Sequence, residues 1–332
     1  MNATERGIRE QFPLWDQVIN EQVPPRVDAV HAVVGCGTSV HIADSIATTL
    51  NEHGVMARAV PGNEWTCRRG SYIPLRIAAH VLALSRSGES TETVAAAKAS
   101  RAAGLQVTAF TCAPGSALCA QGDRVMVAET HPEEGIVMTA SASLMLLMGL
   151  RYAGVEVDAT TTRTARNLLD AADPHLDELI SGRSHFVFLG SGALYGVARE
   201  GALKLQEMSL SQTEAHHPLE YRHGPISLID EKSLVIFLYH PDTAEEEALL
   251  ARELMDKGAR VLGLGGPGTV ELPIASPAAV RALICLPVLQ LLGEYVARMR
   301  GLDTLAPRHL TKVVRIARRT PPSRHPQSGQ PP

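Results

Sequence analysis

The sequence is poor in aromatic residues, and its basic residues form no block. Aromatic side chains make up 4% of the 332 residues, and the formal net charge is −4. Proteins that bind nucleic acids gather Lys and Arg on one face, and those that bind single strands stack bases on aromatic rings. The scarcity of both features argues against a nucleic acid as partner.

Cysteine pairs and long apolar runs are also missing. The five cysteines are scattered, odd in number and form no Cys-x-x-Cys pair, which favours reduced thiols over a disulfide framework or a zinc site. We find no run long and apolar enough to span a bilayer, the best candidate being residues 144–150. The first residues, MNATERGIREQ, lack the apolar centre of a secretory signal. We therefore expect a cytoplasmic protein with no membrane partner.

An alternation of short apolar strands with helices dominates the first half of the chain. An amphipathic helix over residues 5–20 comes first, and Pro24-Pro25 ends it. The expected strands then cover residues 29–34, 80–84, 105–110 and 124–128, and the expected helices cover residues 41–50, 91–103 and 136–152. Such alternation is typical of a parallel sheet with helices on both faces.

The second half repeats this order. Strands are expected at residues 185–189, 234–238, 259–264 and 272–276, with helices through residues 200–207, up to residue 258, and over residues 278–299. Gly190 follows Gly35 by 155 positions, and Gly258 follows Gly104 by 154 positions. Two matching separations of this length indicate a duplicated domain.

The repeat predicts an α/β fold of two tandem domains, each a Rossmann-like, doubly wound parallel sheet flanked by helices. The expected boundaries are an N-terminal helix in residues 1–25, a first domain over 26–157, a linker helix plus second domain over 158–316, and a disordered, Pro-rich tail over 317–332. A composition of 45% apolar residues is enough for two cores.

Two turns rich in hydroxyl groups follow successive strands of the first half and open the next helices. They are Cys36-Gly37-Thr38-Ser39 and Ser85-Arg86-Ser87-Gly88-Glu89-Ser90. Helix N-termini attract anions, and ligands of open parallel sheets lie at the carboxyl ends of strands. One such turn alone is more often a helix cap, but two together favour a phosphate cradle. Neither is a Walker loop or a full G-x-G-x-x-G, so a nucleotide is disfavoured.

The second half departs from this pattern. Its first turn, GSGAL, lacks the Thr-Ser pair, and its second, YHPDTAEEE, has acids where the first half has serines. These acids would repel a phosphate. We expect one copy to bind phosphate and the other to supply a catalytic helix.

Several motifs together resemble one family. GCGTS followed by SRSGES resembles the sugar isomerase (SIS) domain. The stretch REGALKLQEMSLSQTEAHHPLEYRHGPISLID and the later LPVLQLLGEYVARMRGLDTLAPRHLTKVV resemble the isomerase half of glutamine–fructose-6-phosphate aminotransferase, and the resemblance covers about residues 5–316. We recognise no glutaminase domain in these residues, and we therefore expect that glutamine-dependent amination is not the complete activity of this chain.

The resemblance implies a phosphosugar enzyme. The stand-alone relatives are aldose–ketose isomerases and hexosamine-6-phosphate deaminases, and EEGIVMTASAS is similar to that group. The expected substrate is a hexose or hexosamine 6-phosphate, and no metal or organic cofactor is implied. The alternatives are a non-enzymatic phosphosugar-binding regulator and a scaffold.

Three residues take catalytic roles by this resemblance. Glu207 matches the base that moves a proton between C1 and C2, and His223 matches the residue that opens the sugar ring. Lys312 matches a lysine that forms a Schiff base with the open-chain carbonyl. In this family the histidine can enter the site from a neighbouring subunit, so a homodimer with shared sites is expected.

Four further residues complete the expected site. Glu200 and Lys204 share a helix face with Glu207, where Lys204 can hold the base in its ionised form. Thr139 and Ser141 match hydroxyl positions that line the sugar site.

Overall fold

The computed structural model describes residues 1–314, so the predicted tail over 317–332 lies outside the described residues. Two helices open the chain where one was expected, α1 (Ala3–Arg9) and α2 (Phe12–Asn20). The Asn2 side chain caps α1, and Pro13 in the first turn of α2 lacks the N–H that would continue a single helix.

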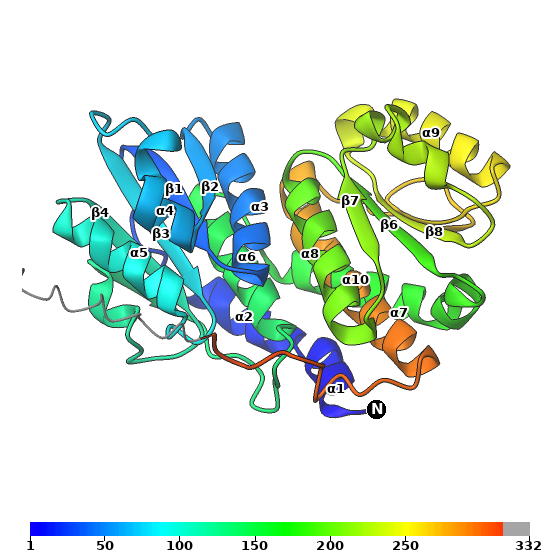
Figure 1. Cartoon of the computed structure of the whole chain (residues 1–332), viewed down its shortest axis with the longest axis horizontal. Coiled ribbons are helices and arrows are strands. Elements are labelled where there is room, and N and C mark those ends of the chain that lie inside the picture. The colour runs from blue at the N-terminus through cyan, green and yellow to red at the C-terminus, as the bar shows by residue number, and fades with distance from the viewer. Residues whose placement is uncertain (315–332) are drawn as a thin grey trace, which may run out of the picture.

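The first half forms a parallel sheet of five strands in the order β2-β1-β3-β4-β5. The strands are β1 (Val30–Gly35), β2 (Ala57–Pro61), β3 (Ala79–Ser85), β4 (Gln106–Thr111) and β5 (Arg124–Val127). The helices are α3 (Thr38–Glu52), α4 (Gly62–Arg68), α5 (Thr91–Ala102) and α6 (Ala140–Ala153). One face of the sheet packs on α3 and α6 and the other on α4 and α5 (Figure 1).

The second half repeats the design, with the order β10-β9-β8-β6-β7. The strands are β6 (His185–Gly190), β7 (Thr213–His216), β8 (Ser233–Leu238), β9 (Arg260–Leu264) and β10 (Val270–Leu272). The helices are α7 (Ala159–Ile180), α8 (Ala193–Ser209), α9 (Ala244–Asp256) and α10 (Ala278–Met299). The predicted α/β fold with two parallel sheets is confirmed.

A single apolar core joins the halves. It contains side chains of α2, α3 and α6 from the first half together with α7, α8 and α10 from the second (Figure 1). Helices α3 and α8 approach closely at Gly196, which has no side chain; a Cβ there would lie only 2.4 Å from Ser45 Oγ. The Ser45 hydroxyl also donates a hydrogen bond to Ala193 O at 2.7 Å. The N-terminal turn of α8 thereby packs against the middle of α3.

Helix α10 corrects one prediction. Its 22 residues have a mean hydropathy of 1.5 over the best window, so it is long and apolar enough to span a bilayer, contrary to the expectation that no such run exists. That window is 89% buried within the protein, and α10 packs against α7 and α8. The run is apolar all round because it lies at the centre of the shared core.

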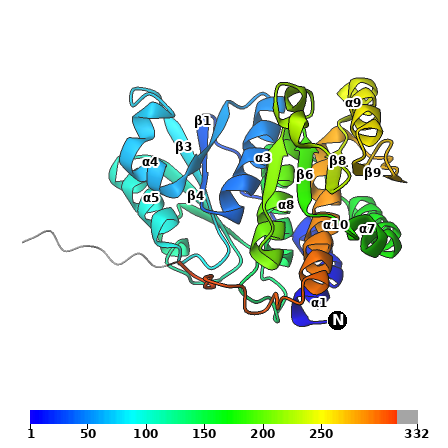
Figure 2. The ribbon, with the colours of Figure 1, turned by 45° about the vertical axis from the view of Figure 1, so that its right-hand side comes forward.

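The segment after α10 returns to the first half. Figures 1 and 2 both show it running from the end of α10, past α1, to the edge of the first sheet near α5. This path brings residues 309–314, which we name the strap, to the carboxyl ends of the first-half strands.

Candidate active site

A cavity of about 350 Å³ lies at the carboxyl ends of β1 and β3. It is lined by Cys36, Gly37, Thr38, Arg86, Ser90, Glu92, Ile136, Met138, Lys204, Glu207, His309, Leu310, Thr311, Lys312 and Val314. Both predicted turns, helix α8 and the strap therefore each contribute to its wall. A larger hollow of about 760 Å³ lies at the amino ends of the same strands, away from these turns. The first cavity has the position that ligands take in open parallel sheets.

The first turn presents backbone N–H groups to this cavity. Gly37 has a φ of 55°, a conformation that favours glycine, and it precedes α3 as its N-cap. Because Gly37 has no side chain, it gives no capping hydrogen bond, and Thr38 already belongs to the helix. The N-terminus of α3 thus lacks a side-chain cap, although Ser39 N and Val40 N donate to Cys36 O and Gly37 O at 3.1 and 3.0 Å.

The second turn is ordered by its own serines. Ser85 Oγ accepts a hydrogen bond from Gly88 N at 3.1 Å, and Ser87 Oγ accepts one from Glu89 N at 3.1 Å. Ser90 is the N-cap of α5 and makes no side-chain capping bond. Of the predicted serines, Ser90 lines the cavity, while Ser39, Ser85 and Ser87 are not among its lining residues.

Helix α8 carries three ionisable side chains on one face. The Lys204 side chain is 1% exposed, its ammonium lies 3.6 Å from Glu200 Oε1, and it makes an ion pair with Glu207. Burial alone would lower the pKa of Lys204, but the charges of Glu200 and Glu207 outweigh burial and raise it. Lys204 is therefore a cation at neutral pH. Glu207, whose side chain is 21% exposed, lies on the cavity wall.

Glu200 lies beneath the cavity instead of lining it. Burial raises the pKa of Glu200 to about 7, even though Lys204 lowers it. The Thr38 hydroxyl also lowers the pKa of Glu200 through a hydrogen bond, but burial has the larger effect. Helix α8 therefore places the Glu207 carboxylate at the cavity. It places Glu200, whose pKa is about 7, on the other side of the Lys204 ammonium.

Lys312 reaches the first sheet from the far end of the chain. Its Nζ donates to Glu134 O at 2.8 Å, and its side chain lines the cavity. The strap thus brings this amine to the same cavity as Glu207.

Thr139 and Ser141 do not line the cavity. Thr139 is the N-cap of α6, and Ser141 lies in the first turn of that helix. Their backbone N–H groups donate to Glu134 Oε1 at 2.7 and 3.0 Å, respectively. The Thr139 hydroxyl donates to the same oxygen at 3.1 Å, and the Ser141 hydroxyl is buried without a partner among the described residues. Glu134 was missed from the sequence, although a carboxylate a few residues before a helix start is a common partner for its free N–H groups.

His223 lies apart from the other predicted residues. It follows the 3₁₀ turn Leu219–Arg222 of the second half, is exposed, and does not line the cavity of its own chain. Residues 1–314 also contain no group of three His, Cys, Asp or Glu side chains placed to hold a metal ion.

Comparison with known proteins identifies the family. The SIS domain model matches residues 31–152 and 179–272, one segment in each half. The chain belongs to the SIS domain family.

Relatives of this SIS protein include phosphosugar enzymes. The isomerizing glutamine–fructose-6-phosphate aminotransferase of Pyrobaculum aerophilum is 30% identical over 86% of this chain, and that of Pseudomonas putida is 31% identical over 86%. Each match covers 51% of the relative, so the chain spans about half the length of these proteins.

Solved structures agree over nearly the whole chain. Glucosamine-6-phosphate deaminase from Thermotoga maritima is 29% identical with a TM-score of 0.84, covering 94% of this chain and 99% of that one. Tagatose-6-phosphate ketose/aldose isomerase from Escherichia coli is 26% identical with a TM-score of 0.76, covering 90% and 93%.

The second SIS domain fills its own turn with a carboxylate. Glu247 of α9 is buried, and it accepts hydrogen bonds from Ser191 Oγ at 2.9 Å, His240 N at 2.9 Å and Thr243 Oγ1 at 2.7 Å. Burial raises its pKa. Ser191 and His240 follow β6 and β8, as the cradle residues follow β1 and β3, so the carboxylate takes the donors that an anion would use.

Proposed function

We propose that the protein is a sugar-phosphate isomerase that acts at C1 and C2 of a hexosamine 6-phosphate and releases the C2 amine as ammonia. The observation that supports this most is the Glu207 carboxylate, paired with the buried Lys204 ammonium, in the same cavity as the two helix N-termini. The likeness to glucosamine-6-phosphate deaminase, over 94% of this chain and 99% of that one, favours this substrate class.

The phosphate end of the substrate is assigned to the first SIS domain. Its ligands would be the N–H groups of the Gly37-Thr38 turn and the hydroxyls of Thr38 and Ser90, which line the cavity. Two helix N-termini together stabilise the double negative charge of a phosphate without a basic side chain.

The proton transfer is assigned to Glu207. The carboxylate takes the C2 proton of the open-chain amino aldose and returns it to C1, while the C1 oxygen takes a proton from the C2 ammonium group, so that C1 becomes an alcohol and C2 an iminium ion. Lys204 remains protonated throughout, because the charges of both neighbouring carboxylates hold its pKa high. Its ammonium stabilises the Glu207 carboxylate between turnovers.

Release of ammonia is assigned to Lys312. Its neutral amine attacks C2 of the iminium ion and displaces ammonia, leaving a Schiff base between Nζ and C2. Water then hydrolyses the Schiff base to the ketose 6-phosphate and the free amine. His223 of the partner subunit would open the sugar ring in a homodimer, because His223 is exposed on its own chain.

A simple aldose–ketose isomerase is the second candidate, supported by the likeness to the tagatose-6-phosphate enzyme. A panel of hexose and hexosamine 6-phosphates, assayed for both ammonia and ketose, separates the candidates. Equal amounts of ammonia and ketose from an amino sugar support the proposal. Ketose without ammonia supports the simple isomerase, and tight binding without turnover supports a regulator.

A further inference from the structure

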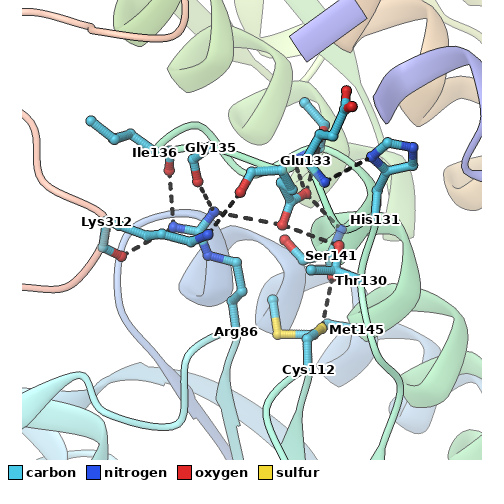
Figure 3. Close-up of polar contacts among 12 residues, drawn as sticks. Arg86, Cys112, Thr130, His131, Glu133, Gly135, Ile136, Ser141, Met145 and Lys312 are labelled. Atoms are coloured by element: carbon cyan, nitrogen blue, oxygen red, sulfur yellow. Dashed lines mark hydrogen bonds and ion pairs between the residues drawn. The ribbon is translucent and has the colours of Figure 1, made fainter. Parts of the chain in front are cut away.

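Arg86 lies in the cavity wall, but its guanidinium binds backbone. Nη1 donates to Gly135 O at 3.0 Å, and Nη2 donates to Ile136 O at 2.9 Å and to Lys312 O at 3.1 Å. Figure 3 shows these three carbonyl oxygens converging on the two terminal nitrogens. The side chain is 8% exposed. Both terminal nitrogens are therefore already hydrogen-bonded, so a bidentate contact with a phosphate would break bonds that this structure contains.

Glu134 connects Arg86 to the same loop. Its side chain is 1% exposed, and Oε2 lies 3.6 Å from Arg86 Nη1. Its other oxygen accepts the N–H groups that open α6, as described above, and its main-chain oxygen accepts Lys312 Nζ. Arg86 thus donates both to the carbonyl oxygen of Lys312 and to the loop that contains Glu134. Lys312 Nζ in turn donates to the main-chain oxygen of Glu134 in that loop.

The strap has a further attachment near this point. Val314 O accepts a hydrogen bond from Thr91 N at 3.4 Å, at the N-terminus of α5. His309, Leu310 and Thr311 are exposed, so the strap is secured by bonds around Lys312 and Val314 rather than by burial. Segments with little buried surface open easily unless such bonds hold them.

We propose that Arg86 and Glu134 form a latch that positions the strap, and with it the amine of Lys312, over the cavity. Arg86 is then a positioning residue that acts through the strap, not a ligand of the phosphate. An arginine suits this task because its planar fork reaches carbonyls from two separate segments, which a lysine ammonium cannot do with fixed geometry. The catalytic consequence rests on the function proposed above, but the latch itself is a property of the folded chain.

Limited trypsin digestion tests the latch without any substrate. The carbonyl that Arg86 holds belongs to the Lys312–Val313 peptide bond, which trypsin can cleave only when the strap opens. We expect Arg86→Gln and Arg86→Lys each to speed this cleavage at least about tenfold, because a hydrogen bond from a charged donor is lost. Cleavage after Arg76, in an exposed loop of the first domain, serves as the internal reference and should not change. Arg58→Gln, at an exposed arginine on β2, is the matched control.

Phosphate binding and kinetics supply the second readout. The latch predicts that both Arg86 variants lower kcat while the affinity for inorganic phosphate, measured by calorimetry, stays near that of the wild type. Unchanged cleavage after Lys312 together with phosphate binding weakened about tenfold would make Arg86 a phosphate ligand and overturn the latch.

A second variant covers the case in which Arg86 variants fail to fold. Glu134→Gln keeps an oxygen for the N–H groups of α6 and removes the charge that faces Arg86. It should also speed cleavage after Lys312, and an unchanged rate in this variant would contradict the latch. Faster cleavage in a protein that turns over no sugar phosphate would support the latch and reject the proposed function.

Discussion

The hydroxyl of Ser191 donates to the carboxyl group of Glu247 at 2.9 Å, so a side chain of the second SIS domain occupies the turn that follows β6. Replacing Glu247 by Ala leaves the donors of Ser191, Thr243 and His240 without an acceptor. We expect a loss of about 1–3 kcal/mol in the free energy of unfolding. Added phosphate should restore part of it, because an inorganic anion can take the vacated place.

Thermal unfolding with and without phosphate checks this expectation. Glu247→Gln is the matched control, since its amide keeps an oxygen for the same donors and should gain no additional response to phosphate. If Glu247→Ala responds to phosphate no more than the wild type does, the second turn does not retain an anion site.

Glu207→Gln should abolish proton transfer. The amide keeps the shape of the side chain but cannot accept the proton, so kcat should fall by roughly 10²–10⁴-fold with substrate binding little changed. Exchange of solvent hydrogen into C1 or C2 should fall with it. Glu246→Gln, at an exposed glutamate of α9, should leave both unchanged. Near-normal exchange in Glu207→Gln would mean that another carboxylate is the base, and Glu200 would be tested next.

Borohydride reduction should trap a sugar on Lys312. The Schiff base proposed above becomes a stable secondary amine when it is reduced, which adds the mass of the sugar phosphate to the peptide that contains Lys312. Lys312→Arg keeps the charge and should give no adduct. An adduct on a different lysine, or a fully active enzyme that yields none, would rule out this role for Lys312.

Mixed dimers should show whether His223 works across subunits. His223→Ala and Glu207→Gln are each expected to be inactive as homodimers. In a mixed dimer, the His223→Ala chain keeps its own Glu207 and receives His223 of the partner subunit. Random mixing therefore restores about a quarter of the wild-type activity, since about half of the dimers are mixed and each has one complete site. Failure of coexpressed chains to regain activity would place His223 in the site of its own chain, or outside it.

Two buried histidines should make the first domain sensitive to acid. Burial lowers the pKa of His31 and lowers that of His80 to about 4, so the folded state favours neutral rings. The unfolded chain takes up protons near pH 6.5, and stability therefore falls as the pH drops from about 6.5 towards 4.

His80→Gln should flatten this dependence. At pH 5 it should recover about 1–2 kcal/mol of the stability that the wild type loses relative to pH 7. His175→Gln, at an exposed histidine of α7, serves as the control and should leave the slope unchanged. Unfolding temperatures measured across this range provide the test, and parallel curves for the wild type and His80→Gln would contradict it.

The central strands could be predicted from the sequence, whereas two of the edge strands could not. The strand at residues 80–84 is apolar throughout, and β3 is buried along its whole length. The missed strands β2 and β7 lie beside the first strand of each sheet, and their partly exposed residues leave no apolar run to recognise. Their pairing depends on neighbouring strands distant in sequence, which local patterns do not report.

Some residues of the candidate site could also be predicted from the sequence, and others could not. The spacing of Glu200, Lys204 and Glu207 on one helix predicted a shared face, and the structure shows their ion pairs. Glu134 was missed although it stands just before a helix start, because an acidic residue in a loop is usually solvated and its burial shows only in the folded loop. His223 does not line the cavity of its own chain, so its role across subunits remains a prediction that one chain does not test.

Because the strap lies near the C-terminus but contacts the first domain, the cavity is completed late in protein synthesis. Both sheets and the shared core are complete once α10 has emerged from the ribosome, and domains generally fold as units during synthesis. The cavity still lacks its last wall at that moment, because Lys312 is translated after every strand and helix described here. A nascent chain can thus complete its core before the wall of its candidate site, and a chain released just after α10 would contain both sheets but not Lys312.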